Sequence, residues 1–202
     1  MITPFYLVCD ESQSMEGAKL DACNTALSNI HAAVAADHIV NDKIRIGVIS
    51  FSDTAQVLLP LSKMTDVVDF SGLVVKGGTN YGNAFTCLKN TIQTDIADLK
   101  KGGAKVNRPI VFFISDGEPT DTNWKAAHAQ VADKTWPFSP HIISFGLSGA
   151  QADTIREVAT QVDKKGKSFA YLADDDASGA VLREIFNSLL SPILRDECLE
   201  GR

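Results

Sequence analysis

The sequence predicts an α/β domain with a doubly wound, mostly parallel sheet, one antiparallel edge strand and helices on both faces. Short apolar runs typical of buried strands alternate with helical segments along the chain. Parallel neighbours need a long crossover connection, which a helix between two strands supplies. One connection, at residues 52–54, is too short to contain a helix, so the strands that it joins are expected to run antiparallel.

Apolar spacing predicts the first elements of this pattern. Residues 5–9 are all apolar or aromatic, as in a strand that is buried on both faces. Residues 17–40 carry apolar side chains at helical spacing, which predicts one long helix. Residues 44–51 predict the second strand, and residues 55–59, bounded by Pro60, predict the antiparallel edge strand.

The middle of the chain repeats the alternation. A glycine-rich loop at residues 77–82 leads into a helix predicted at residues 83–100. Residues 109–115 are the most strand-like run in the sequence. Positions 119–121 then supply turn and cap chemistry for a helix that ends near Lys134.

The last elements continue in the same order. Residues 141–146 predict a strand, residues 153–162 a helix and residues 168–172 a short strand. An amphipathic helix is predicted at residues 178–194. The alternation continues to the end, so residues 1–202 are expected to form a single domain.

Composition limits the class of protein and the kinds of partner. The 202 residues are 45% hydrophobic and 22% charged, as in an ordinary globular domain. A net charge of −6 with scattered basic residues argues against nucleic acid as a partner. No apolar run is long enough to span a membrane and no signal segment precedes the first strand, so a cytoplasmic protein is expected. The four cysteines form no Cys-x-x-Cys pair, and the four histidines show no metal-ligand spacing.

Oxygen-bearing side chains follow the first predicted strand. Asp10, Ser12 and Ser14 stand at every second position directly beyond it. Ligands of open α/β sheets bind beyond the carboxyl ends of the strands, and Mg²⁺ is commonly held by oxygen ligands that include only one or two carboxylates. One interpretation of this motif is therefore a magnesium site. The other is that Ser12 or Ser14 simply caps the helix that starts near Met15.

Two further loops offer oxygen ligands at the same edge of the predicted sheet. Thr79 lies in the glycine-rich loop, and Asp116 follows the strand at residues 109–115. Taken with the first motif, Asp10, Ser12, Ser14, Thr79 and Asp116 resemble the metal-ion-dependent adhesion site of von Willebrand factor A domains, in the same chain order and on the same elements.

The resemblance implies a function and a division of roles among the five residues. Ser12 and Ser14 would bind Mg²⁺ or Mn²⁺ directly, and Thr79 directly or through water. Asp10 and Asp116 would act largely through waters, which leaves the cation under-neutralised and attractive to an anionic oxygen. A partner protein would supply that oxygen from an Asp or Glu, so the chain is expected to be an interaction module rather than an enzyme.

The loops at residues 77–82 and 115–121 look most like those of bacterial tellurium-resistance (TerY-like) members of this family. That likeness implies a role in a stress-response assembly. In the family, small ligand shifts at the site accompany displacement of the last helix. Here residues 178–194 would either move in this way when a partner binds or serve only as a rigid part of the core.

Other functions fit the residues less well. A Mg²⁺-dependent phosphohydrolase would need a nucleophile and a base, and no His or Lys stands beside Asp10 or Asp116 in the sequence. A metal-free scaffold would not need all five ligands. Residues 166–168 end like a phosphate-binding loop but precede a strand, and the acidic run at residues 174–176 is better placed to cap the last helix than to bind a second cation.

Overall fold

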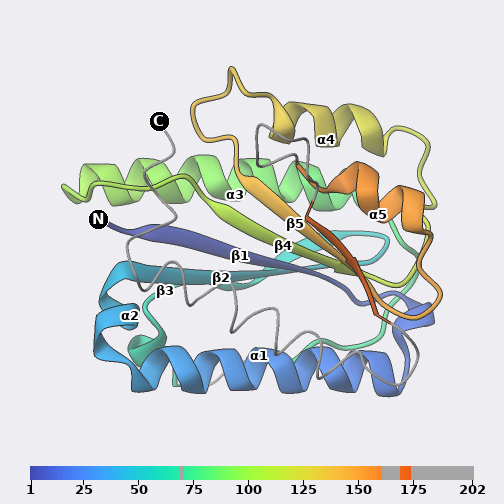
Figure 1. Ribbon diagram of the computed structural model, residues 1–202, viewed down its shortest axis with the longest axis horizontal. Coiled ribbons are helices and arrows are strands. Elements are labelled where there is room, and N and C mark those ends of the chain that lie inside the picture. The colour runs from blue at the N-terminus through green and yellow to red at the C-terminus, as the bar shows by residue number, and fades with distance from the viewer. Residues whose placement is uncertain (69–70, 161–168, 174–202) are drawn as a thin grey trace.

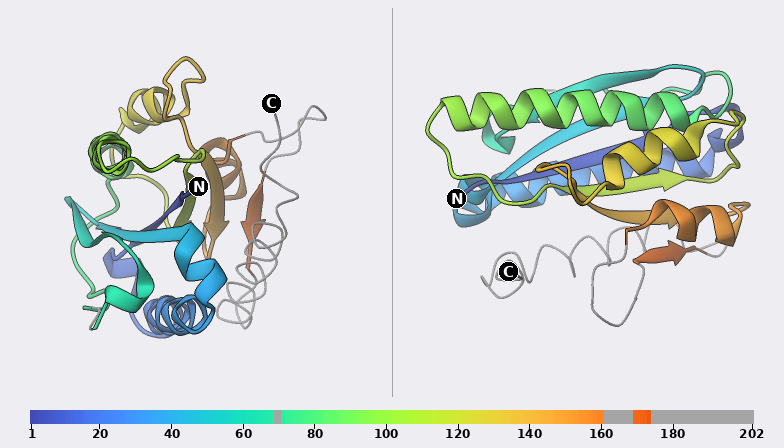
Figure 2. Two further views of the ribbon diagram at one scale, coloured as in Figure 1. Left: turned by 90° about the vertical axis from the view of Figure 1, so that its left-hand side faces the viewer. Right: turned by 90° about the horizontal axis from the view of Figure 1, so that it is seen from above.

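The first strand is buried along its whole length, so the sheet must be covered on both faces. The computed structural model describes residues 1–68, 71–160 and 169–173. All eight residues of β1 (Thr3–Asp10) are buried. Helices lie on both sides of the sheet in the described part of the chain, as Figures 1 and 2 show. This arrangement confirms the predicted fold class.

The described strands form one sheet in the order β3-β2-β1-β4-β5-β6. The strands other than β1 are β2 (Ile44–Phe51), β3 (Ala55–Ser62), β4 (Ile110–Ser115), β5 (His141–Gly146) and β6 (Ala170–Leu172). Only the β2–β3 pair is antiparallel among these strands, and β3 lies at an edge. The short connection after β2 therefore joins two antiparallel strands, as the sequence predicted.

Helices cover the two faces in two groups. The described helices are α1 (Ala18–Ala36), α2 (His38–Lys43), α3 (Tyr81–Lys101), α4 (Trp124–Ala132) and α5 (Ala152–Val158). On one face, Phe5 and Leu7 pack in a core with residues of α1 and α2. On the other face, Tyr6 and Val8 pack in a second core with residues of α3, α4 and α5. The alternation along β1 therefore divides its side chains between the two cores. No helix in the described ranges is long and apolar enough to cross a membrane.

The predicted helix at residues 17–40 is wrong as a single element. It is divided at Asp37, whose side chain accepts hydrogen bonds from the backbone N–H groups of Ile39 (3.0 Å) and Val40 (3.1 Å). These bonds make Asp37 the N-cap of α2, which runs on to Lys43. Apolar periodicity alone could not show the break, since Val34 and Val40 both belong to the same core.

Other boundaries also differ from the predictions. β3 continues through Pro60 to Ser62, because an edge strand can place a residue without an N–H group on its unpaired side. α5 ends at Val158 rather than at residue 162. α4 begins at Trp124, and its N-cap residue makes no side-chain cap bond. Asp121 instead accepts bonds from the N–H groups at the start of α3, as described below.

Several predictions fall on residues outside the described ranges. These are the phosphate-loop-like stretch at 166–168, the acidic run at 174–176 and the helix at 178–194. The expected coupling between the candidate site and that last helix therefore stays a prediction.

Candidate metal centre

The first and third candidate loops meet because the strands that carry them are neighbours. β1 pairs with β4 in parallel register, with Cys9 opposite Ile114. Asp10 and Ser115 therefore end adjacent strands at the same edge, and the Ser115 hydroxyl donates to Asp10 Oδ2 (2.5 Å). Asp116 follows one residue later, so the parallel sheet brings together two acids that are more than a hundred residues apart in the chain.

Hydrogen bonds connect four of the five predicted residues. The backbone N–H of Ser12 donates to Asp10 Oδ1 (2.8 Å). The hydroxyls of Ser12 and Ser14 lie 3.1 Å apart, and Ser14 Oγ donates to Asp116 Oδ1 (2.7 Å). Neither serine side chain caps a helix: the N-cap of α1 is Gly17, and Ser12, at the N-cap of a short 3₁₀ turn, makes no side-chain cap bond there. The capping interpretation of the serines is therefore wrong.

Thr79 joins the group from the glycine-rich loop. It is 6% exposed, and its carbonyl accepts bonds from the N–H (2.8 Å) and the hydroxyl (3.0 Å) of Thr120. A Cβ placed on Gly117 would lie 3.4 Å from Thr79 Oγ1 and 3.6 Å from Ser14 Oγ. Both hydroxyls therefore border the same small space beside the Asp116 loop.

Backbone contacts hold the glycine-rich loop against the first loop. Gln13 N–H donates to the carbonyl of Gly77 (3.0 Å), and Lys76 N–H donates to the carbonyl of Glu11 (2.7 Å). Gly77 has a φ of 24°, and a Cβ there would lie 1.9 Å from Asp53 Oδ2. Only glycine fits at this position, since both the conformation and the space exclude a side chain.

The start of α3 is fixed from a distant loop. Asp121 accepts hydrogen bonds from the backbone N–H groups of Tyr81 (2.9 Å) and Gly82 (3.1 Å). The Tyr81 hydroxyl donates in turn to the carbonyl of Gly117 (3.0 Å). These bonds tie the loop after β4 to the loop that carries Thr79, so the relative positions of Thr79 and Asp116 are set by the fold.

Two buried acids give the site its charge. Asp10 is fully buried and Asp116 is 3% exposed. Burial raises the pKa of Asp10 to about 6; hydrogen bonds from Ser115 and Ser12 oppose this shift, and the charge of Asp116 adds to it. The charged form of Asp10 is therefore costly in this position, and a nearby cation would stabilise it.

Lys19 is a member of the site that sequence reasoning missed. Its ammonium group forms an ion pair with Asp116 Oδ2 and donates to the carbonyl of Ser14 (3.2 Å). Its side chain is 28% exposed, whereas that of Asp116 is buried. Lys19 stands in the first turn of α1, and only the fold brings it to an acid on the loop after β4. No Lys or His stands beside Asp10 or Asp116 in the sequence, so no local pattern indicates Lys19.

Glu11 is also part of the site's surroundings. It is 2% exposed, and its Oε1 accepts bonds from the Ser50 hydroxyl (3.0 Å) and the Lys76 ammonium (2.8 Å). Its Oε2 is buried and has no hydrogen-bond partner among the residues that the structure describes. Because Lys76 pairs with this carboxylate, Glu11 is held away from the role of a free general base.

The donor set fits a hard divalent cation. The predicted ligands offer three hydroxyls and two carboxylates, all of them oxygen donors of the kind that Mg²⁺ and Mn²⁺ accept. No group of three or more His, Cys, Asp or Glu side chains suited to a metal occurs in the described ranges. A metal site in this part of the protein would therefore depend on hydroxyl ligands.

The pKa of Asp10 gives an expected pH dependence for metal binding. Its pKa lies above the ordinary value of 3.8, so metal-free folded protein holds a proton on Asp10 up to about pH 6. A cation must displace that proton, and the affinity for Mg²⁺ should fall about tenfold per pH unit below pH 6. The proton also stabilises the metal-free fold below pH 6, and this contribution is lost as the pH rises through the folded-state pKa.

Calorimetric titration at several pH values measures how the affinity for Mg²⁺ depends on pH. In the Asp10→Asn variant this affinity should depend less steeply on pH. An unchanged pH dependence in that variant would mean that Asp10 is not the group that the cation deprotonates.

The fold and the clustered loops define a class: a doubly wound α/β domain with oxygen donors at the carboxyl ends of its strands. Residues 5–118 match the family model described as the von Willebrand factor type A domain. The chain belongs to this family. A search of curated protein sequences finds no match.

Solved structures share this fold at low sequence identity. The PilB minor pilin of Streptococcus sanguinis is 12% identical with a TM-score of 0.70, over 100% of this chain and 64% of that one. The vWF domain of the type V pili tip protein Mfa5 from Porphyromonas gingivalis is 13% identical with a TM-score of 0.64, over 95% of this chain and 96% of that one. Proximal thread matrix protein 1 of the mussel byssus is 16% identical with a TM-score of 0.66, over 91% and 47%. The chain thus spans about half the length of the mussel protein.

Proposed function

We propose that this domain binds a partner protein through a Mg²⁺ or Mn²⁺ ion held by Asp10, Ser12, Ser14, Thr79 and Asp116. The observation that carries the proposal is the hydrogen-bonded connection from Asp10 through both serines to Asp116, with Thr79 at its side. Residues from three separate loops converge there on one small space.

The contacts of the acids support the division of roles among the ligands. Both carboxylate oxygens of Asp10 already accept hydrogen bonds, from Ser12 N–H and the Ser115 hydroxyl. Asp10 is therefore suited to orient the loop and to act on the cation through water. With neutral hydroxyls nearest to it, the cation would keep much of its charge. An Asp or Glu of the partner would then complete its coordination.

Several similar structures are described as pilus proteins, which supports a role in protein assembly. The setting that we propose for this chain is a bacterial stress-response assembly in the cytoplasm, related to tellurium resistance. It is supported by the likeness of the loops at residues 77–82 and 115–121 to TerY-like proteins.

The same loops should show no metal-dependent hydrolysis of phosphate esters. Glu11 is held by Lys76, and the remaining basic group at the site, Lys19, is paired with Asp116. Neither provides a base beside a free nucleophile. Assays with p-nitrophenyl phosphate and Mg²⁺ should therefore give the uncatalysed rate. A metal-dependent rate that is lost in Ser12→Ala would favour a phosphohydrolase instead.

The proposed function is tested by capture of partners on the immobilised domain. We expect proteins from a bacterial lysate to be retained with Mg²⁺, released by EDTA, and lost from the Ser14→Ala domain. Ser28→Ala is the matched control, because Ser28 is exposed on α1 and its hydroxyl donates to the carbonyl of Asn24 in the same helix (3.0 Å). Retention that ignores both EDTA and Ser14→Ala would contradict a metal-dependent interaction.

A further inference from the structure

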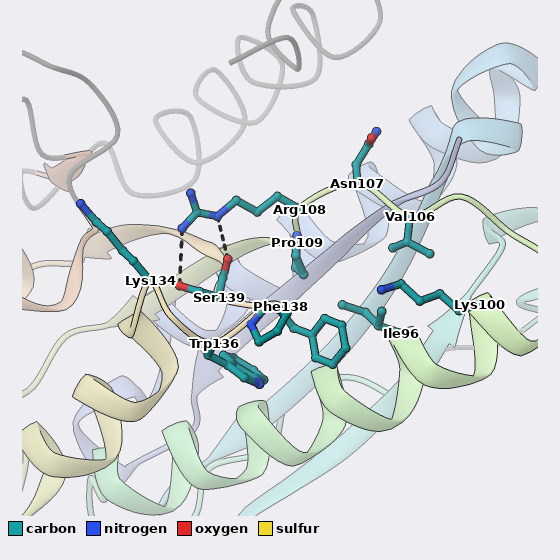
Figure 3. Close-up of a pocket in the computed structure, with 11 residues that line it drawn as sticks. Ile96, Lys100, Val106, Asn107, Arg108, Pro109, Lys134, Trp136, Phe138 and Ser139 are labelled. Carbon is teal, nitrogen blue, oxygen red and sulfur yellow. Dashed lines mark hydrogen bonds between the residues drawn. The ribbon is translucent and has the colours of Figure 1, made fainter. Parts of the chain in front are cut away.

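A hollow of about 370 Å³ lies at the end of the sheet opposite the candidate metal centre (Figure 3). Its walls come from the last turns of α3, from residues 106–109 before β4, and from residues 134–139 between α4 and β5. Thr79 precedes the start of α3, whereas Lys100 stands near its end. A helix of 21 residues is about 30 Å long, so the two sites are separate.

The charge of this hollow is opposite to that of the whole chain. Lys100, Arg108 and Lys134 line it, and no acidic residue of the described ranges does. The chain as a whole carries a net charge of −6. Within the described ranges, no carboxylate forms an ion pair with any of these three cations. Positive charge is therefore gathered here without internal compensation from those parts of the chain.

Two contacts to Ser139 fix the Arg108 guanidinium and leave some of its N–H donors unused by them. Its Nε donates to the carbonyl of Ser139 (2.6 Å), and its Nη2 lies 3.4 Å from Ser139 Oγ, as the dashed lines in Figure 3 show. A guanidinium has five N–H donors, so three are left over from its contacts in the described part of the chain. The positive potential extends to His141, whose pKa is lowered to about 4 by burial first and by the charge of Arg108 second.

Apolar side chains line the rest of the hollow. Phe138 and Trp136 contribute rings from the loop before β5, and Ile96 and Val106 add aliphatic surface. The Lys100 ammonium lies 4.8 Å from the centre of the Phe138 ring. Lys100 also stands in the last turn of α3, where backbone carbonyls offset part of its charge. Arg108 and Lys134 are therefore the groups most available to an anion.

From this combination we propose that the hollow binds a small phosphate monoester with an apolar or aromatic body. The fork of the Arg108 guanidinium matches phosphate oxygens, and Lys134 adds a second charge. Several cations without an acid favour a doubly charged group over a single carboxylate. The volume lies within the range of small-molecule sites, and the rings provide contact for the body of the ligand.

Phenyl phosphate titrated into the full chain tests this proposal. EDTA is present throughout, so that a metal at the Asp116 loop contributes nothing and failure here is distinct from failure of the proposed function. Binding is followed by calorimetry. We expect phenyl phosphate to bind with a dissociation constant of about 1 mM or lower. Benzoate, which lacks the second charge, and inorganic phosphate, which lacks the ring, should each bind at least tenfold more weakly.

Matched variants locate the binding. Lys134→Gln removes an exposed charge and leaves the packing intact, and Arg108→Gln removes the fixed guanidinium. Each variant should bind phenyl phosphate about fivefold more weakly or worse, since a charged hydrogen bond contributes about 1 kcal/mol or more. Lys105→Gln is the control, because Lys105 is exposed, close in sequence and outside the hollow. Absence of binding, equal binding of phosphate alone, or equal losses in all three variants would overturn the proposal.

Discussion

Asp116→Asn is expected to weaken Mn²⁺ or Mg²⁺ binding by about 10- to 100-fold, as is typical for groups that support metal ligands. Asp116 is buried and accepts the hydroxyl of Ser14 and the ammonium of Lys19. The substitution keeps the shape of the side chain but removes one of the two acids that balance the cation. Calorimetric titration with MnCl₂ at neutral pH measures the loss directly.

Asp98→Asn is the matched control for that substitution. Asp98 is exposed on α3, near the end of the helix that is far from the candidate ligands. It has the same side chain and undergoes the same change of charge, so it reports the effect of net charge alone. Equal metal affinities in the Asp98 and Asp116 variants would remove Asp116 from the site.

Lys19→Met is expected to act in the opposite direction and to tighten metal binding. The ammonium of Lys19 pairs with Asp116 Oδ2, so it competes with a divalent cation for the same charge. A partly buried ion pair of this kind contributes on the order of 1 kcal/mol. Its removal should therefore raise the affinity for Mg²⁺ by about fivefold or more, as seen in the same titration.

Lys125→Met provides the control for the Lys19 variant. Lys125 pairs with Glu157 (2.7 Å), and both side chains are largely exposed and belong to α4 and α5. This variant should leave the metal affinity unchanged. Weaker metal binding in Lys19→Met would mean that Lys19 supports the arrangement of the ligands rather than competing with the ion.

Most of the fold could be predicted because each strand and helix carries its own pattern. The apolar run at residues 5–9 is buried on both faces, and the short connection after β2 allows only an antiparallel partner. The division of the first long helix could not be predicted. It depends on the bonds that the Asp37 carboxylate accepts from the N–H groups of Ile39 and Val40, which interrupt the helix without changing its apolar periodicity.

The candidate ligands could be proposed from sequence because each follows a predicted strand or precedes a predicted helix. Their surroundings could not, since they depend on contacts between distant segments. Lys19 contacts Asp116, which lies 97 positions further along the chain, and Asp121 accepts a bond from the first N–H group of a helix that begins 40 residues before it. Local patterns predict that Asp121 bonds within its own turn. Only the folded chain shows that it accepts bonds from N–H groups at the start of α3.

The basic hollow is a further feature without a local pattern. Its cations come from three segments, and each is an ordinary surface charge when considered in its own stretch of sequence. Parallel packing of β4 and β5 brings Arg108 to Ser139 and so gathers these charges in one place.

Diffraction from a crystal soaked in MnCl₂, recorded at a wavelength where manganese scatters anomalously, locates a bound metal ion without reference to any variant. We expect one strong anomalous peak beside β1 and β4, at about 2.0–2.3 Å from the hydroxyl oxygens of Ser12 and Ser14. Lys19 should then have moved away from Asp116. A crystal that diffracts well but shows no peak at these hydroxyls, or shows one only elsewhere on the protein, would mean that the five residues do not form a metal site.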